Sequence, residues 1–332
     1  MTTSIQLHVI CPCILLYFVR FFNISGMLKS IGEKEHMRFT MENLKQMRFV
    51  GERALYGKKD IVVTDSVFDD GESPLKECGN VELVNCRFGW KYPLWYCNNV
   101  TASDCSFLAG SRAGIWYTNN IKITDSLIAA PKDFRRCNGI TLKNVFIPNA
   151  QETLWNCSSV TIDKADIKGD YLAMNCSDMT IDNLSLEGNY AFDGCRNLTI
   201  RNSRMLTKDA FWNTENVKVY DSYICGEYLG WNSKDITLVN CTIESLQGMC
   251  YIDDLKLINC KLVNTTLAFE YSNIKADVRS HIDSVFNPLS GTITAESIGE
   301  LILEKDKVDK DKTDINCKEI HRVSERPDWI PS

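Results

Sequence analysis

Residues 179–205, MTIDNLSLEGNYAFDGCRNLTIRNSRM, hold one complete repeat of this chain and the start of the next. Met179 and Leu198 are 19 residues apart, and each opens a segment with apolar residues at its first, third and eighth positions. An Asn stands at the fifth position of both segments. A unit this short cannot bury a core alone, so its copies must stack on one another. The sequence therefore predicts a solenoid.

The same repeat covers most of the chain. An apolar residue that follows a turn, which we call the anchor, recurs at Ile61, Val81, Val100, Ile121, Ile140, Val160, Met179, Leu198, Val217, Ile236, Leu255 and Ile274. Successive anchors are 20, 19, 21, 19 and 20 residues apart and then 19 apart six times. Such a regular period determines the architecture before any single residue is interpreted.

Each repeat contains short strands separated by turns. A second apolar residue comes two positions after the anchor, with Thr, Lys or Glu mostly between them, which is the alternation of a strand buried on one face. Asn or Asp comes four positions after the anchor, as at Asp65, Asn85 and Asn144, and turns the chain. A third apolar column lies six positions before the anchor, as at Leu94 and Phe134. Three short strands and three turns therefore fill the period.

These columns predict an all-β fold with one shared interior. No part of the repeat carries a helical stripe, which excludes leucine-rich, ankyrin and tetratricopeptide arrays, and a propeller blade needs about 40 residues. We therefore predict a single right-handed parallel β-helix of about 12 coils, each of ~19 residues, with the hand taken from the usual hand of parallel crossovers.

The domain boundaries follow the repeat. The β-helix is predicted over residues 37–303, with an N-terminal cap at 38–60 and closing coils at 275–303. Residues 304–332 are rich in charge and predict a mobile or loosely packed tail. Residues 1–36 form an apolar leader that lacks a basic start and a cleavage site, so we expect it to lie outside the fold without stable membrane insertion. An upstream start codon is its expected origin, and a weak export or membrane signal is the alternative.

Composition narrows the classes of partner. A net charge of −6 offers no basic field, so no nucleic-acid partner is expected.

Cysteine occurs 15 times, and a row of cysteines lies three residues before the anchors, which predicts small buried residues at Cys78, Cys97, Cys137, Cys157, Cys176 and Cys195. No CxxC spacing occurs, so neither a metal nor another cofactor is predicted, and the thiols favour a reducing, cytoplasmic compartment.

One outer face is rich in aromatic residues. Five positions before the anchors, the column reads Trp95, Trp116, Arg135, Trp155, Met174, Asp193, Trp212 and Trp231. Eight positions before the anchors stand Tyr92, Tyr171, Tyr190 and Tyr228. If the column six positions before the anchor points inward, the tryptophans point outward and form a ladder. Exposed aromatic rows bind sugar rings or other partners, whereas tryptophans that turn inward only pack, and both interpretations stay open.

Two arginines, Arg135 and Arg136, interrupt this ladder between Trp116 and Trp155. A guanidinium between two indoles is a cation–π stack, and it can also receive a carboxylate or phosphate. The catalytic candidates are these two arginines and the nearby acids Asp133, Glu152, Asp170 and Asp193. Glycoside hydrolysis needs two carboxylates about 5–9 Å apart, but the sequence selects no pair. All four histidines lie outside the repeat, which excludes a histidine-based triad there.

Several segments resemble one known family. They are GERALYGKKD, DDGESPLKE, WKYPLWYC, RAGIWYTNN, APKDFRRCNG, PNAQETLWNC, KDAFWN, GEYLGWNS, ESLQGMCYID and LAFEYS, within residues 46–303. Together they are similar to the bacterial domain of unknown function 3737 family, whose members resemble pectate-lyase-like right-handed β-helices. The resemblance implies this fold, but it brings no activity and no site residue with it.

Two classes of function therefore remain, and the residues do not decide whether the protein is an enzyme. The first is a binding or scaffold module that docks another protein, or a second copy of itself, on the aromatic face. The second is a carbohydrate-active hydrolase or lyase that seats sugar rings on the ladder and uses carboxylates near Arg135.

Overall fold

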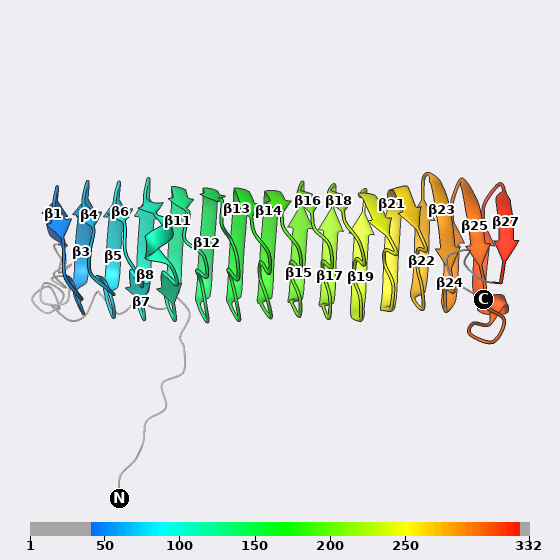
Figure 1. The fold of residues 1–332 in the computed structure, drawn as a ribbon, viewed down its shortest axis with the longest axis horizontal. Coiled ribbons are helices and arrows are strands. Elements are labelled where there is room, and N and C mark those ends of the chain that lie inside the picture. The colour runs from blue at the N-terminus through cyan, green and yellow to red at the C-terminus, as the bar shows by residue number, and fades with distance from the viewer. Residues whose placement is uncertain (1–40, 326–332) are drawn as a thin grey trace, which may run out of the picture. The chain divides into compact units, whose positions relative to one another are not determined.

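The computed structural model describes residues 41–325, so the predicted leader at 1–36 lies outside the described residues. Residues 41–325 form a right-handed parallel β-solenoid, in which successive coils stack in chain order along one axis (Figure 1). The described strands pair in parallel, as β1 does with β3 and β24 with β26. The only described helices are the short 3-10 turns η2 (Ala109–Ser111) and η3 (Lys310–Lys312). The predicted all-β fold is confirmed.

The first strand of each coil lies in one large sheet. These strands are β1 (Glu42–Lys45), β3 (Lys59–Thr64), β5 (Gly79–Val84), β8 (Asn98–Ser103), β11 (Asn119–Ile128), β12 (Asn138–Ile147), β13 (Ser158–Lys168), β14 (Ser177–Glu187), β15 (Arg196–Arg201), β17 (Glu215–Tyr220), β19 (Ser233–Val239), β21 (Ile252–Thr266), β22 (Asn273–Val278), β24 (Ser290–Thr294) and β26 (Thr313–Asn316). The longest of them, β11 to β14 and β21, run on through the following turn. Elsewhere the second strand is separate, as β2 (Arg48–Phe49), β4 (Val67–Phe68), β6 (Arg87–Phe88), β9 (Ser106–Phe107), β16 (Arg204–Leu206), β18 (Tyr223–Cys225) and β20 (Thr242–Leu246).

The solenoid has more coils than the sequence predicts. Fifteen first strands are present, against about 12 predicted coils, because one coil precedes Ile61 and two follow Ile274. At the anchor position these extra coils carry Glu42, Gly291 and Thr313, so the apolar signal is absent there. The spacing also becomes irregular, with 17 residues from Ile274 to Gly291 and 22 from Gly291 to Thr313.

The charged segment after residue 303 is not only a tail. Strand β26 pairs with β24, and β27 (Ile320–Ser324) pairs with β25 (Ser297–Ile302), so the solenoid continues to Ser324. Among the many charged residues, Ile315, Cys317 and Ile320 are partly buried against the core. These three apolar residues add a coil where the neighbouring coil already offers a hydrogen-bonding edge.

The region predicted as an N-terminal cap, residues 38–60, is described from Met41 onward. There β1 and β2 pair in register with β3 and β4. The ring of Phe49 stacks on Phe68 with 4.7 Å between centroids, and this phenylalanine stack continues through Phe88 to Phe107. The described part of the cap is therefore a coil of the repeat itself.

The third face departs from the prediction of three strands per coil. Strands form there only as β7 (Leu94–Trp95) with β10 (Ile115–Trp116), and near the C-terminal end as β23 (His281–Phe286), β25 and β27. In most other coils every second residue has a left-handed backbone, as at Lys132, Phe134 and Arg136 with φ of 63°, 55° and 53°. Most amides of this face still bond to a neighbouring coil, and the amide of Phe192, for example, donates to the carbonyl of Leu172 at 2.8 Å.

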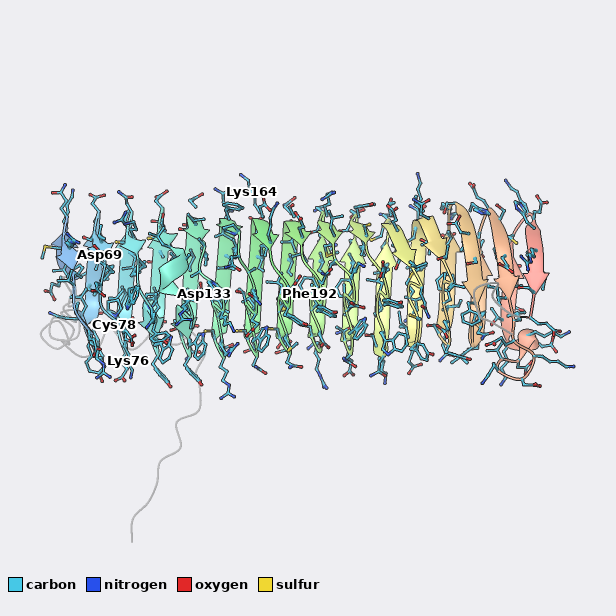
Figure 2. All side chains as sticks on the ribbon, in the orientation of Figure 1. Asp69, Lys76, Cys78, Asp133, Lys164 and Phe192 are labelled. Atoms are coloured by element: carbon cyan, nitrogen blue, oxygen red, sulfur yellow. The ribbon has the colours of Figure 1, made fainter. Side chains whose placement is uncertain are left out.

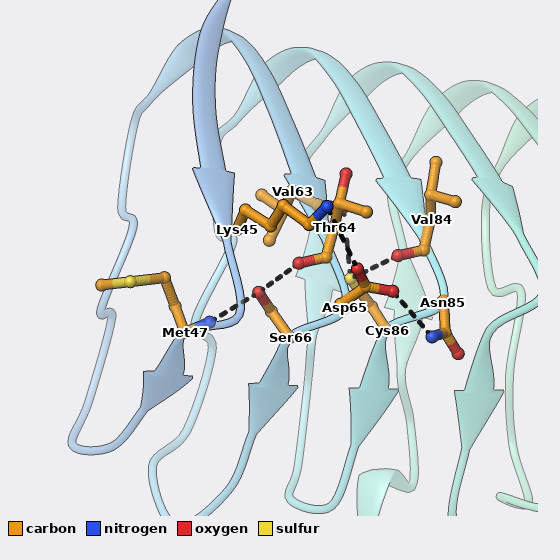
Figure 3. Close-up of polar contacts among 9 residues, drawn as sticks. All are labelled: Lys45, Met47, Val63, Thr64, Asp65, Ser66, Val84, Asn85 and Cys86. Atoms are coloured by element: carbon orange, nitrogen blue, oxygen red, sulfur yellow. Dashed lines mark hydrogen bonds and ion pairs between the residues drawn. The ribbon is translucent and has the colours of Figure 1, made fainter.

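Asparagine and aspartate shape the turn after the first strand, as Figure 3 shows. Asp65 and Asn85 both have φ of 52°. The side-chain amide of Asn85 donates to the carboxylate of Asp65, one coil earlier, at 2.8 Å. The hydroxyl of Ser66 accepts from the amide of Met47 at 3.0 Å and donates to the carbonyl of Thr64 at 2.8 Å. These residue types tolerate the left-handed backbone and bond locally, so the predicted turn is confirmed.

The predicted row of interior cysteines is buried, and hydrogen bonding as well as small side-chain volume determines which residues occupy it. The thiol of Cys176 donates to the carbonyl of Leu154 at 2.8 Å, and the thiol of Cys195 donates to the carbonyl of Ala173 at 2.8 Å. Where the row has Thr118, the hydroxyl donates to the carbonyl of Leu94 at 2.7 Å. The column therefore takes Cys, Thr or Ser because an inward carbonyl of the preceding coil needs a donor.

Candidate functional site, an aromatic face

The third face presents three outward columns, which lie eight, five and four residues before most anchors. The residues between them, seven and six before the anchor, point inward; Asp133 and Phe134 are both fully buried. All five predicted tryptophans of the ladder are half-buried and line this face. We call these three outward columns the aromatic face.

The rings of the aromatic face stack on one another along the solenoid. Trp95 and Trp116 have centroids 5.1 Å apart and planes 6° apart, and Tyr171 and Tyr190 have centroids 4.8 Å apart and planes 7° apart. This spacing matches the separation of neighbouring strands, so each ring covers the face of the next. The stacked rings therefore offer their edges to a partner, and a sugar ring cannot lie flat on a face that is already covered.

The indoles are also tied to the backbone. The Nε1 group of Trp116 donates to the carbonyl of Lys132 at 2.8 Å, and that of Trp155 donates to the carbonyl of Tyr171 at 2.9 Å. The Nε1 groups of Trp95 and Trp212 likewise donate to the carbonyls of Ala113 and Tyr228. Each of these indoles thus lies across the coil that follows it, which holds the ladder rigid.

Arg135 replaces an indole within the stack. Its guanidinium carbon lies 4.8 Å from the ring centroid of Trp116 and 4.7 Å from that of Trp155. The guanidinium Nη2 is 3.4 Å from a carboxylate oxygen of Glu152, whose other oxygen is 2.9 Å from the Nζ atom of Lys132. The predicted cation–π sandwich is therefore present, with the carboxylate of Glu152 shared by two cations.

The ladder changes at Met174 and Asp193, which occupy the indole column over two coils. Asp193 is half-buried, and its carboxylate accepts a hydrogen bond from the side-chain amide of Asn213 at 2.9 Å. Beyond this break, Trp212 lies 6.1 Å from Trp231, which lies 4.2 Å from Tyr251. The planes of these pairs are tilted by 37° and 36°, so the aromatic face has a segment of parallel rings and a segment of tilted rings with a polar interruption between them.

Sequence reasoning missed a second row of rings. Tyr96 and Tyr117 stack at 4.7 Å with planes 2° apart, beside the indoles, and Arg136 approaches the ring of Tyr117 at 5.9 Å. Near the other end, Tyr251 lies 5.3 Å from Tyr271. The signal was available, because these tyrosines follow the indole column by one residue.

Asp133 lies inside the solenoid and not on the outer face where the sequence analysis placed it (Figure 2). The left-handed backbone at Lys132 and Phe134 turns both Asp133 and Phe134 inward, which simple alternation does not predict. One oxygen accepts from the amide of Gly114, and the other, Oδ2, has no partner among the described residues. Burial raises the pKa of this carboxyl well above its usual range. The group is sealed from any substrate on the outer face.

The other predicted acids, Glu152 and Asp170, lie in different surroundings. Glu152 is ion-paired, and Asp170 is exposed in a hollow of about 590 Å³ that Glu187 also lines. Asp170 accepts from the amide of Asn189 at 2.8 Å, while Glu187 lies 3.0 Å from the Nζ atom of Lys168. Desolvation, then the charge of Glu227, raises the pKa of Asp209, an acid of the same face two coils from Asp170. Glu152, Asp170 and Glu187 therefore each have a different hydrogen-bond or ion-pair partner.

Two further properties of residues 41–325 bear on function. No group of three His, Cys, Asp or Glu side chains is arranged to hold a metal ion in this part of the chain. None of its helical turns reaches the length and apolarity needed to cross a bilayer.

The fold and this face define a parallel β-solenoid with a rigid, edge-on aromatic ladder. The chain belongs to the protein family of unknown function DUF3737, whose model matches residues 42–316. No curated protein matches it at a significant level.

The comparison with solved structures finds weak likenesses. The full-length plasmid-mediated fluoroquinolone resistance protein QnrB1 is 12% identical, with 59% of this chain and 93% of that chain covered and a TM-score of 0.30. The A-module of the Azotobacter vinelandii mannuronan C-5 epimerase AlgE6 is 8% identical, with 86% and 91% covered and a TM-score of 0.33. The AlgE4 A-module is 7% identical, with 86% and 89% covered and a TM-score of 0.27. Likenesses this weak carry no functional argument.

Proposed function

We propose that this protein is a binding module that holds an extended partner along its aromatic face. The observation that carries this proposal is the concentration of half-exposed, stacked rings on one face over many coils. On the first strands, by contrast, the outward positions hold Thr, Lys and Glu, as at Lys122, Thr180 and Lys218. Rows of exposed aromatic side chains are enriched in interaction surfaces, and a rigid ladder loses little conformational entropy on binding.

The module is tested with a pair of matched variants. Tyr171→Ala/Tyr190→Ala removes a stacked ring pair of the aromatic face, whereas Phe146→Ala removes an exposed ring, 45% accessible, from a different face. Binding is measured against a panel of neutral and acidic glycans, and self-association is measured by sedimentation. We expect a partner of one of these kinds whose affinity falls about tenfold or more in the tyrosine variant and changes little in Phe146→Ala. Equal affinities in both variants, or no binding and no self-association at all, would overturn the proposal.

One observation favours a second candidate, a carbohydrate-active enzyme. Asp170 and Glu187 line the same hollow at the edge of the aromatic face, so two carboxylates are within one surface depression. Hydrolysis of a glycosidic bond uses two such groups. Cleavage of an oligosaccharide by the wild-type protein that is abolished in Asp170→Asn and retained in Asp166→Asn, an exposed acid elsewhere, would establish the enzyme. Absence of cleavage products across the glycan panel would leave the binding module as the better account.

A further inference from the structure

One coil differs from all its neighbours on the aromatic face. At the three outward positions, eight, five and four residues before its anchor Ile140, it carries Lys132, Arg135 and Arg136, which we call the cationic rung. The coil before it has Ala113, Trp116 and Tyr117 at these positions, and the coil after it has Glu152, Trp155 and Asn156. Three cations are thus concentrated in one coil and bordered by rings on both sides.

The charge of this rung is only partly balanced. Glu152 is its one ion-pair partner among the described residues, at 2.9 Å from Lys132 and 3.4 Å from Arg135. The side chain of Arg136 is exposed, and among residues 41–325 it has no ion-pair partner and approaches the ring of Tyr117 at 5.9 Å. Asp133 contributes no contact to the rung, because it is fully buried on the inner side of the coil. Three cations therefore stand against a single carboxylate, in a chain whose net charge is −6.

The backbone of the rung and the side chain of Arg135 are held in place before any ligand arrives. The amides of Lys132, Arg135 and Arg136 donate to carbonyls of neighbouring coils at 2.9, 3.1 and 2.9 Å. The side chain of Arg135 is only 23% exposed, because Trp116 and Trp155 cover both faces of its guanidinium. A fixed guanidinium loses little entropy when it binds an oxyanion, and its planar donors match the geometry of a carboxylate or sulfate.

Resting on the proposed function, we propose that the cationic rung is the specificity site of the module and that its ligand is an acidic glycan, a sugar polymer that carries carboxylate or sulfate groups. The rung places ammonium and guanidinium donors beside ring edges, which suits an oxyanion with hydroxyl groups around it. An extended peptide fits less well, because the backbone groups of this face already bond between coils and cannot accept an added strand. The ring faces that would hold apolar peptide anchors are covered as well.

The test compares two double variants that remove the same charge from different faces. Lys132→Gln/Arg136→Gln neutralises the rung and leaves the stacked Arg135 in place. Lys122→Gln/Lys218→Gln neutralises two exposed cations of the first-strand face as the matched control. Binding to heparin and hyaluronan is measured by calorimetry at low and at physiological salt, with dextran as the neutral glycan and polyglutamate as the acidic peptide.

We expect heparin or hyaluronan to bind, dextran not to bind, and the rung variant to lose about tenfold or more in affinity while the control loses less than about twofold. Equal losses in the two variants, or no binding of either acidic glycan, would overturn the assignment. Rung-dependent binding of polyglutamate without binding of either glycan would instead identify an acidic peptide as the ligand. A partner lost in Tyr171→Ala/Tyr190→Ala but retained by the rung variant would uphold the binding module and reject this specificity site.

Discussion

The carboxyl group of Asp133 accepts a hydrogen bond from the backbone amide of Gly114, one coil earlier in the solenoid. A side chain at Gly114 would collide with this carboxyl, because an added Cβ atom would lie 2.6 Å from its Oδ1 atom. Glycine thus allows a buried acid to reach the backbone of its neighbour. The arrangement joins the protonation of one side chain to the stability of the fold.

Asp133 is expected to make stability depend on pH. Its pKa is raised in the folded state, so the folded protein keeps a proton that the unfolded chain releases above a pH of about 4. The stabilisation is complete below that value and is lost as the pH rises toward the folded-state pKa, by up to about 1.4 kcal/mol per pH unit. Asp133→Asn stays neutral throughout, so its melting temperature should rise relative to wild type as the pH increases from 4. Parallel pH profiles for the two proteins would contradict this prediction.

The thiol of Cys176 is expected to act as a buried donor. Cys176→Ala leaves the carbonyl of Leu154 without its bond, which should cost about 1–3 kcal/mol of unfolding free energy. Cys176→Ser keeps a donor of similar size, as Ser233 does in the same column, where its hydroxyl donates to the carbonyl of Phe211. Chemical denaturation of the two variants should therefore rank Ser above Ala. The reverse order would show that volume, and not the hydrogen bond, determines the residue at this position.

Phe192, which is labelled in Figure 2, lies in the interior of the third face. Its ring stacks on Phe211 with centroids 5.4 Å apart, and it is fully buried. Phe192→Ala should lower the unfolding free energy by about 3–5 kcal/mol, because it opens a cavity between two coils. Phe146→Ala removes an exposed ring and should change it by no more than about 0.5 kcal/mol. Similar losses for both variants would show that the third face is loosely packed.

The segment after Leu303 is expected to contribute to stability. Ending the chain at residue 303 removes β26 and β27 and leaves β24 and β25 without their outer partners. Exposed strand edges and the uncovered core beside Ile293 and Ile298 should lower the melting temperature and promote aggregation. Ending the chain at residue 325 keeps both strands and serves as the control. A melting temperature shared by the two truncated chains would contradict the added coil.

The sequence predicted the regular part of this structure because identical positions in neighbouring coils must stack. The anchors, the turn asparagines and the cysteine row follow from that rule alone. The ends were missed because Glu42, Gly291 and Thr313 interrupt the anchor column. In those coils the register is set by hydrogen bonds to a formed neighbour, which a pattern of apolar residues does not record.

The candidate site was predicted less completely, for a reason that lies in the backbone. The ladder and the sandwiched Arg135 follow from spacing, but the inward direction of Asp133 depends on left-handed residues at Lys132 and Phe134. Neither Lys nor Phe signals that conformation in a sequence, because it is imposed by bonds to the next coil. The edge-on presentation of Trp95 and Trp116 could have been inferred, since rings in one column of neighbouring coils are close enough to stack face to face.

The stacking of coils in chain order also defines how this protein responds to mechanical load. The hydrogen bonds between coils join strands and turns that lie side by side along the solenoid, as between β14 and β15 or from the amide of Phe192 to the carbonyl of Leu172. Tension applied through Met41 and Ser324 would therefore open the bonds of one coil at a time, as a zipper opens, and would not shear many coils together. Extension should proceed as a series of small steps of one coil each, so the molecule would yield gradually and keep most of its length folded.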